Sequence, residues 1–436
     1  MKVLVVGGGG REHALAWGLS RSPSVSEVVV GPGNPGTEGC ARNAPVDPKD
    51  AAAVAALADE LDADLVVVGP EEPLVRGVVD AVQARGRLAF GPTSDGARLE
   101  GSKRWMKELL EGAGVPTAAH GSFHAGDEEA ALAFLATLDG LYVVKTDGLA
   151  AGKGVVVTES LDEAADAVRR YLSGAAFGAA GRTVVIEEGL RGPELSLLVV
   201  CNGDPGAAVP MAPAQDFKRI GDGDTGPNTG GMGAYSPVPI VDDEMVEQVM
   251  LTAVQPTLHT LAEQGVAYRG VLYAGIMLTA DGPKVLEYNV RFGDPECQVV
   301  VPRLATDLGE LCRASAAGGP LPPVEFRDDA CVTVVLACEG YPEDPRTGDV
   351  IEGVEDAAVL PDVVVFHAGT SRRDDGALVT SGGRVLAVTA LGPTIGDSRT
   401  RAYDAASRIT WPGMQHRHDI ASVAASYDGV QGGAGT

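Results

Sequence analysis

The segment KTDGLAAGKGVVV, Lys145–Val157, sets this chain apart from the common phosphate-binding α/β proteins. Its glycine-rich loop, Asp147–Gly154, lies between two predicted strands, Tyr142–Thr146 and Val155–Val157. The loop resembles a Walker A motif but is one residue short, and Gly154 stands where that motif needs serine or threonine. It therefore predicts a hairpin whose backbone N–H groups fold over phosphates. The alternative is an ordinary glycine hairpin without a ligand.

Upstream of this hairpin, the first hundred residues alternate strand and helix signals. Strands are predicted at Lys2–Val6, Glu27–Val30, Asp64–Val68 and Leu88–Phe90, each closed by glycine, and a helix opens at Asp47-Pro48. This alternation predicts a doubly wound parallel sheet, in which ligands bind beyond the carboxyl ends of the strands.

Further signals divide the rest of the chain. A helix is predicted from about Asp95 to Glu111, and the polar, glycine-rich stretch 213–237 is too long for an ordinary connection. Strands are expected at Gly270–Thr279 and Lys284–Val290, followed by a linker and a small β-rich region. The predicted units are an N-terminal domain at 1–102, a second domain at 103–320 with a mobile lid at about 116–191, a β-rich domain at 327–421 and a flexible tail at 422–436.

Composition narrows the function. The 436 residues carry a net charge of −26, which excludes a nucleic-acid binder that works by a general basic field and disfavours an anionic membrane surface. The six cysteines form no C-x-x-C pair, so we expect reduced, mostly buried thiols. With neither a secretory nor a membrane-spanning segment apparent, we expect a cytoplasmic small-molecule enzyme.

The turn at Gly7–His13 invites a dinucleotide interpretation that fails. The G-x-G-x-x-G pattern lacks its third glycine in either register, and no acidic residue follows the second strand, so a nicotinamide dehydrogenase is excluded. A glycine turn that enters a helix can still bind phosphate, here with help from Arg11. A tight structural turn is the alternative.

The segment Lys284–Glu296, KVLEYNVRFGDPE, carries the strongest chemical signal. Glu287, Asn289 and Arg291 alternate along a predicted strand and so project from one face. A carboxylate and a carboxamide oxygen suit Mg²⁺, and the guanidinium can neutralise a transferring phosphoryl group. A solvated strand face is the alternative.

Lysine usage and a pair of glutamates add weaker signals. The chain has only eight lysines beside 26 arginines. Four of the eight lie in or beside glycine-rich or polar loops: Lys103, Lys145, Lys153 and Lys218. Lysines in such places suggest point-charge contacts to phosphate. The run Glu187–Leu190 ends a predicted strand, with Glu194 shortly after, where carboxylates can accept ribose hydroxyls.

Six segments together resemble the phosphoribosylamine–glycine ligase family of the ATP-grasp superfamily. They are MKVLVVGGGGREHALAW, VVGPEEPLVRGVVD, EGSKRWMKELL, KTDGLAAGKGVVV, QDFKRIGDGDTGPNTGGMGAYSP and EYNVRFGDPECQ. The resemblance implies an α/β ATP-grasp fold with an N-terminal doubly wound parallel-sheet domain and a small β-rich C-terminal domain. Thr146, Phe217 and Ala421 depart from the family's alanine, histidine and glycine.

The family's reaction joins glycine to 5-phosphoribosylamine through glycyl phosphate, using ATP with Mg²⁺ or Mn²⁺, in purine biosynthesis. We expect a monomer that could contact the preceding pathway enzyme transiently, with no nucleic-acid or membrane partner. The alternatives are another ATP-grasp carboxylate–amine ligase that acts on a different acid, and a non-catalytic nucleotide sensor.

The resemblance also implies residue roles. The residues expected to bind ATP are Lys103, Lys145, Gly148, Gly152, Lys153, Gly154, Glu187, Glu188, Leu190 and Glu194. The metal ligands are expected to be Glu287 and Asn289. The catalytic residues are expected to be Arg291, Asp294, Lys218 and Asp216, and the substrate-binding residues Gly8, Gly9, Gly10, Arg11, Gly293 and Glu296.

Overall fold

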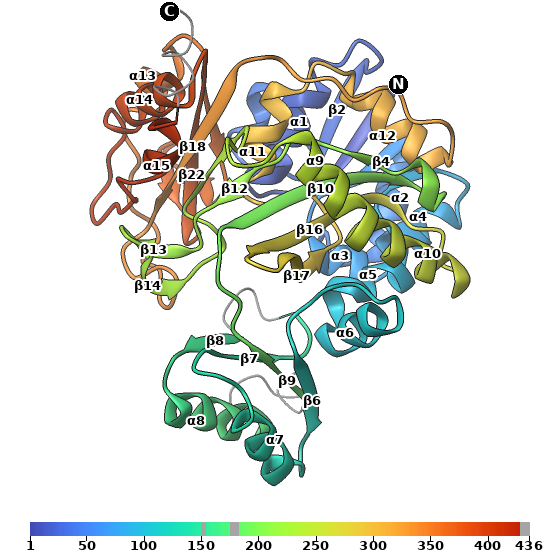
Figure 1. The fold of residues 1–436 in the computed structure, drawn as a ribbon. Coiled ribbons are helices and arrows are strands. Elements are labelled where there is room, and N and C mark those ends of the chain that lie inside the picture. Colours follow the sequence, from blue (N-terminus) through green and yellow to red (C-terminus); the bar gives the residue numbers. More distant parts are fainter. Residues whose placement is uncertain (150–153, 175–182, 428–436) are drawn as a thin grey trace, which may run out of the picture.

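The computed structural model describes residues 1–149, 154–174 and 183–427. It has a large body and a smaller antiparallel unit, which lies at the bottom of Figure 1. No helix in these three described ranges is long and apolar enough to cross a membrane. All six cysteines lie within the ranges, and five of them are buried, as expected.

The N-terminal region is the predicted parallel sheet, with strand order β3-β2-β1-β4-β5. Its strands are β1 (Lys2–Gly7), β2 (Glu27–Pro32), β3 (Arg42–Asn43), β4 (Leu65–Val68) and β5 (Leu88–Phe90). Its helices are α1 (Gly10–Leu19), α2 (Ala51–Glu60), α3 (Glu71–Val75), α4 (Val78–Gln83) and α5 (Ser94–Gly101). Nearly continuous burial along β1 and β4 follows from helices covering both faces of a parallel sheet.

Two helix boundaries differ from the prediction. Asp50, not Asp47, caps α2, because its carboxylate accepts the Ala53 N–H at 3.0 Å. The helix predicted over 95–111 is broken at Ser102, which has extended backbone angles and caps α6 (Lys103–Gly112) through its hydroxyl. The break starts a new helix at Lys103.

The predicted lid, residues 116–191, contains a four-stranded antiparallel sheet with order β6-β9-β7-β8. Its elements are β6 (His120–His124), α7 (Glu128–Leu135), β7 (Tyr142–Thr146), β8 (Val155–Thr158), α8 (Leu161–Leu172) and β9 (Thr183–Glu188). The two helices pack on the sheet around a separate hydrophobic core that includes Leu135, Val168 and Ile186. The glycine-rich loop does join two paired strands, β7 and β8, as expected.

A central antiparallel sheet with order β11-β10-β16-β17 carries the segment with the strongest chemical signal. Its strands are β10 (Glu194–Asn202), β11 (Val209–Pro210), β16 (Arg269–Thr279) and β17 (Gly282–Asn289). The helices of this region are α9 (Asp243–Val249), α10 (Gln255–Glu263), α11 (Cys297–Val300) and α12 (Leu308–Ala317). A π-helical turn, Met250–Val254, joins α9 to α10 within the predicted helix.

The C-terminal sheet has order β12-β15-β18-β22-β19 and takes two strands from the long glycine-rich stretch. Its strands are β12 (Gln215–Asp216), β15 (Gly233–Ser236), β18 (Ala330–Ala337), β19 (Val363–His367) and β22 (Arg384–Gly392). Two separate hairpins belong to this region: β13 (Arg219–Gly221) with β14 (Thr225–Asn228), and β20 (Thr370–Arg372) with β21 (Leu378–Thr380). Its helices are α13 (Val354–Ala358), α14 (Ile395–Ala406) and α15 (Ser422–Ala425). The C-terminal sheet therefore includes strands from before residue 327, since β12 and β15 pair into it.

Candidate active site

A cavity of about 720 Å³ gathers most of the predicted site residues. Its lining comes from the N-terminal region, from the predicted lid, from α6, from the central sheet and from the C-terminal sheet. The predicted residues that line it are Arg11, Lys103, Lys145, Gly148, Gly154, Glu187, Glu188, Leu190, Glu194, Asp216, Lys218, Glu287, Asn289, Arg291, Asp294 and Glu296. Within the described part of the chain, Gly8, Gly9, Gly10 and Gly293 are not among the lining residues. Gly152 and Lys153 lie outside the described residues.

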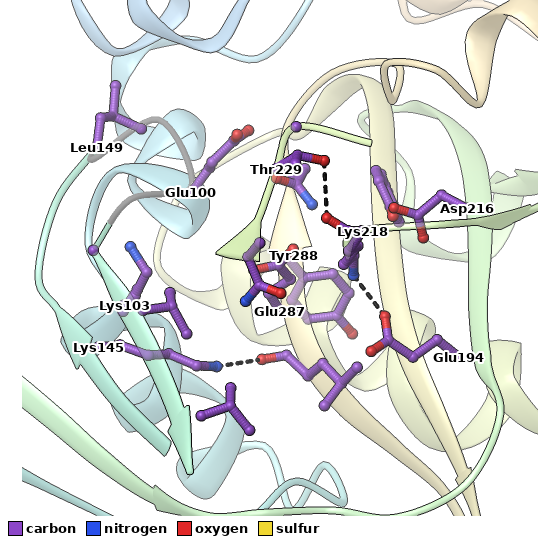
Figure 2. A pocket seen from close by; sticks show the side chains of 18 of the residues that line it. Glu100, Lys103, Lys145, Leu149, Glu194, Asp216, Lys218, Thr229, Glu287 and Tyr288 are labelled. Atoms are coloured by element: carbon purple, nitrogen blue, oxygen red, sulfur yellow. Dashed lines mark hydrogen bonds and ion pairs between the residues drawn. The ribbon is translucent and has the colours of Figure 1, made fainter. Parts of the chain in front are cut away.

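Two lysines form the cationic side of the cavity. Lys103, the first residue of α6, donates from Nζ to the Gly148 carbonyl at 2.9 Å. Lys145, on β7, donates from Nζ to the Leu286 carbonyl at 3.3 Å and so reaches from the predicted lid to β17. Figure 2 shows both lysines on one side of the pocket, with Glu287 between them and a second group of charged residues. The two cations thus converge on a region bounded by the glycine hairpin.

Glu187 makes two contacts that the sequence did not predict. Its carboxylate is buried, with the Lys145 Nζ 2.9 Å from one oxygen and the Lys107 Nζ 3.0 Å from the other. Although burial raises it, these two ammonium groups hold the pKa of Glu187 below its ordinary value. Glu187 therefore links two lysines at the cavity wall, and its contact with the nucleoside stays a prediction.

Strand β17 presents the predicted metal ligands to the cavity. Glu287 and Asn289 both lie on the strand and line the cavity, whereas Arg291 follows two residues after the strand ends. Although burial raises it, the ammonium groups of Lys218, Lys145 and Lys103 hold the pKa of Glu287 below its ordinary value. Glu287 is therefore an ionised oxygen donor at neutral pH.

This donor set fits a magnesium or manganese ion that also binds phosphate. A carboxylate and a carboxamide oxygen, two residues apart, are hard oxygen ligands of the kind these ions prefer. The described residues contain no cluster of three or more histidine, cysteine, aspartate or glutamate side chains able to hold a metal by themselves. A site with two protein ligands would thus depend on other oxygens, and phosphate is the usual source.

Arg291 is held by carboxylates that the sequence did not single out. Its guanidinium donates to Glu100 at 2.8 Å, to Glu71 at 3.4 Å and to the Asn289 carboxamide oxygen at 3.1 Å. Although burial raises it, Arg291 and Arg11 lower the pKa of Glu71 to about 2. Glu71 lies in the segment VVGPEEPL that carries part of the family resemblance, and this was the available signal. Glu100 opens the segment EGSKRWMKELL, which also carries part of the resemblance, but its pairing with Arg291 is seen only in three dimensions.

The opposite side of the cavity carries acidic residues around one lysine. The Lys218 Nζ lies 2.7 Å from the Glu194 carboxylate, and Thr229 donates from its N–H and its hydroxyl to the Lys218 carbonyl. Burial first, then the nearby carboxylates of Glu296 and Glu194, raise the pKa of Asp216 to about 8 against the opposing effect of Lys218. This side can therefore hold both a cationic and an anionic substrate group.

Glu296 and Asp294 continue the acidic side. The hydroxyl groups of Tyr273 and Ser196 donate to Glu296 at 2.7 and 3.0 Å. Arg384, from β22, lies 3.1 Å from the Asp294 carboxylate and donates to the Asp294 carbonyl. Neither Arg384 nor Tyr273 was predicted, and no sequence motif pointed to either one. Each lies more than twenty residues away in the sequence from the carboxylate that it contacts.

The N-terminal glycine turn is partly closed by its own helix. The Gly9 N–H donates to the Glu12 carboxylate at 2.6 Å, and Arg11 Nε donates to the other Glu12 oxygen at 2.7 Å. Arg11 also donates to the Phe292 carbonyl at 3.0 Å and lines the cavity. The Gly9 N–H is therefore already bonded within the turn, and its contact with a phosphate stays a prediction. Arg11 remains at the cavity wall.

With this geometry established, comparisons with known proteins agree along the whole chain. Models for the N domain, the ATP-grasp (A) domain and the C domain of phosphoribosylglycinamide synthetase match residues 1–100, 101–297 and 331–423. The chain belongs to the phosphoribosylamine–glycine ligase family. Family members from Brucella melitensis and Streptomyces coelicolor are each 49% identical to it, covering 96% and 98% of this chain and 97% and 100% of their own.

Solved structures agree with this assignment to the ligase family. The phosphoribosylamine–glycine ligase of Thermotoga maritima superposes with a TM-score of 0.83 at 35% identity, covering 96% of this chain and all of its own, 100%. The biotin carboxylase domain of the Hydrogenobacter thermophilus 2-oxoglutarate carboxylase has a TM-score of 0.71 at 17% identity, over 95% of this chain and 91% of its own. At that identity the second likeness shows the ATP-grasp fold alone. The predicted fold and family are both confirmed.

Proposed function

We propose that the cavity is the site at which this chain carries out the ATP-dependent ligase reaction of its family. The chain is a phosphoribosylamine–glycine ligase of purine biosynthesis. The observation that carries the assignment of the site is the convergence of Lys103 and Lys145 with Glu287 and Asn289 on one cavity. Cations and ionised oxygen donors in that arrangement suit the polyphosphate of ATP with a divalent metal.

The chemistry requires activation of a carboxylate. A glycine carboxylate oxygen attacks the γ-phosphorus of ATP, the bond from that phosphorus to the ADP oxygen breaks, and glycyl phosphate forms. The amine nitrogen of 5-phosphoribosylamine then attacks the glycyl carbonyl carbon, inorganic phosphate leaves, and the nitrogen loses a proton. Positioning of reactants and neutralisation of negative charge supply most of the acceleration.

ATP would lie between the predicted lid and the central sheet. Lys103 and Lys145 hold its phosphates, and Gly148 and Gly154, which also line the cavity, lie beside them. Leu190 and Glu188 contact the base from the end of β9, and Glu194 accepts the ribose hydroxyls. Exclusion of water from the filled cavity protects glycyl phosphate from hydrolysis.

Glu287 and Asn289 would hold Mg²⁺ or Mn²⁺. The metal, when bound, offsets charge on the ATP phosphates. Arg291 faces the acyl phosphate, and its ion pairs with Glu71 and Glu100 keep the guanidinium oriented. Asp216, Lys218, Asp294 and Glu296 surround glycine and the amine.

The 5-phosphate of phosphoribosylamine would lie beside the N-terminal turn. Gly8, Gly9, Gly10 and Arg11 contribute there. Gly293 lets the Glu296 carboxylate approach closely, since a side-chain carbon added at Gly293 would lie 2.2 Å from a Glu296 oxygen. A side chain at residue 293 would therefore displace Glu296.

The deciding experiment measures ADP release from ATP and Mg²⁺ with glycine and freshly generated phosphoribosylamine added separately and together. We expect release only with both, and glycinamide ribonucleotide as product. Release with an acid other than glycine would mean that the chain acts as a different ATP-grasp ligase.

One substitution tests whether the reaction takes place in this cavity. Glu287→Ala is expected to lower turnover at least about a hundredfold, the scale of several kcal/mol that a catalytic metal contact supplies. Near-normal turnover at saturating Mg²⁺ would mean that Glu287 is not a ligand of the catalytic metal.

A further inference from the structure

Lys107 is a fully buried cation that does not touch the cavity. It lies one helical turn after Lys103 on α6, and its side chain has 0% exposure. It is absent from the residues that line the cavity, among those the structure describes. Removing an ammonium group from water costs several kcal/mol, so its burial needs a compensating interaction. Because it cannot reach substrate, any effect on the reaction must act through another residue.

Its contacts connect α6 to the predicted lid and to the central sheet. The Lys107 Nζ lies 3.0 Å from Glu187 on β9 and donates to the Thr117 hydroxyl at 2.7 Å. That hydroxyl donates to the Val285 carbonyl of β17 at 2.7 Å. Glu187 in turn lies 2.9 Å from the Lys145 Nζ, which donates to the next carbonyl on β17, that of Leu286. The contacts form a closed path that begins and ends on β17.

Positive charges outnumber negative charges along this path. One buried carboxylate, Glu187, lies between two lysines, so the three side chains together carry a net charge of about +1. If Glu187 had only Lys145 as its partner, that ammonium would be neutralised at the place where phosphate is expected. Lys107 supplies the second positive charge, so Glu187 does not neutralise the Lys145 ammonium by itself.

We propose that Lys107 is a positioning residue for ATP binding, which through Glu187 fixes the Lys145 ammonium and keeps its charge available to the ATP phosphates. The inference rests on the proposed phosphate-binding role of Lys145. A purely structural ion pair would stabilise the fold without changing nucleotide affinity. The two possibilities therefore differ in the ATP affinity expected once a second substitution restores the charge balance.

The test uses the full-length enzyme, four variants and one control variant. Lys107→Met is expected to raise the KM for ATP, and the Kd of a non-hydrolysable ATP analogue measured by calorimetry, at least about tenfold. The KM for glycine is expected to stay within about twofold, since glycine does not meet Lys145. Lys107→Met with Glu187→Gln removes one charge of each sign, and is expected to recover most of the ATP affinity. This double variant removes the buried Lys107 and Glu187 charges together and keeps the net charge of about +1 on Lys145, so it keeps the test usable if Lys107→Met does not fold.

Two further variants distinguish the possible failures. Lys145→Met is expected to raise the KM for ATP, and adding Lys107→Met to it should raise the KM no further, because Lys107 acts through Lys145. Multiplying effects, or no recovery in the Lys107→Met/Glu187→Gln enzyme, would overturn the positioning role and leave the ATP site intact. An unchanged ATP dependence of Lys145→Met would overturn the proposed phosphate site itself. Lys49→Met, which removes an exposed lysine paired with Glu72 at 2.7 Å, is the control.

Discussion

The two glycine-rich turns of this chain look alike in the sequence but have opposite electrostatic surroundings. At the N-terminal turn, the Gly9 N–H is bonded to the Glu12 carboxylate, which is 2% exposed. At the hairpin after β7, the Gly148 carbonyl accepts from Lys103, and Lys145 lies on the strand that leads into the loop. One turn is closed by an acid from its own helix, and the other is bounded by lysines.

The difference teaches that glycine alone does not make a phosphate site. Glycine permits close backbone approach in both turns, but the neighbouring charges decide whether an anion is attracted. Glu12 satisfies an N–H that would otherwise face solvent or ligand, as in a capping box. We therefore expect the hairpin to contribute chiefly to ATP binding and the N-terminal turn chiefly to structure and to orienting Arg11.

The largest expected effect comes from Lys103→Met. Because Lys103 is a preorganised cation beside the hairpin, its loss should lower kcat/KM for ATP at least about a hundredfold. The KM for phosphoribosylamine should stay within about threefold, as measured by steady-state kinetics with each substrate varied in turn. An equal loss for both substrates would mean that the two turns share one phosphate site.

Glu12→Gln tests the N-terminal turn. The substitution weakens the bonds to the Gly9 N–H and to Arg11, whose other acidic partner, Glu71, is 3.7 Å away. We expect the free energy of unfolding to fall by about 2 kcal/mol, the scale of hydrogen bonds to a charged group. Urea unfolding measures it, and the KM for ATP should not change. Tighter phosphate binding without loss of stability would contradict the structural role of Glu12.

Gly148→Ala tests the hairpin backbone. Gly148 has φ +91°, a conformation that alanine adopts at a cost of about 1 kcal/mol, so the KM for ATP should rise about fivefold. Gly126→Ala is the matched control, since Gly126 has φ +106° and open space around it but lies away from the cavity. A similar rise in both variants would show that the effect is general strain in the predicted lid.

The smallest expected effect is a pH dependence at the N-terminal turn. Burial first, and then His367, lower the pKa of His13 from 6.5 to about 3, and its Nδ1 accepts the His367 N–H at 2.8 Å. The unfolded chain therefore binds a proton that the folded chain does not. Stability from this histidine is present above pH 6.5 and is lost as the pH falls toward 3.

Between pH 7 and pH 6 the loss from His13 is about 0.7 kcal/mol by this linkage. His13→Asn keeps an acceptor for the His367 N–H but does not titrate, so its unfolding free energy should vary less over this interval. Urea unfolding at the two pH values measures the difference. Identical pH dependence in the variant and the parent enzyme would assign the titration to other groups.

Local sequence predicted the elements whose signal is contained within a few residues. The apolar runs that became β1, β4 and β7 were predicted within one or two residues, because burial on a sheet needs only a short hydrophobic segment. The break at Ser102 was missed, since both flanking segments are helical by pattern and only the serine cap separates them. The strands at 215–216 and 233–236 were missed because they are short and because the second of them pairs with β18, almost a hundred residues later, while the first pairs with the second.

The sequence by itself determined the family, the glycine hairpin between two strands, and the oxygen donors Glu287 and Asn289 on one strand face. These depend on residue type and on the two-residue period of a strand. Tertiary structure decided how the charges pair: Glu187 with Lys107 and Lys145, Arg291 with Glu100, and Asp294 with Arg384. The physical reason is that an ion pair depends on a distance of a few ångströms between elements that are far apart in the chain. No local pattern encodes that distance, and it is these pairings that distinguish a residue that binds substrate from one that positions another.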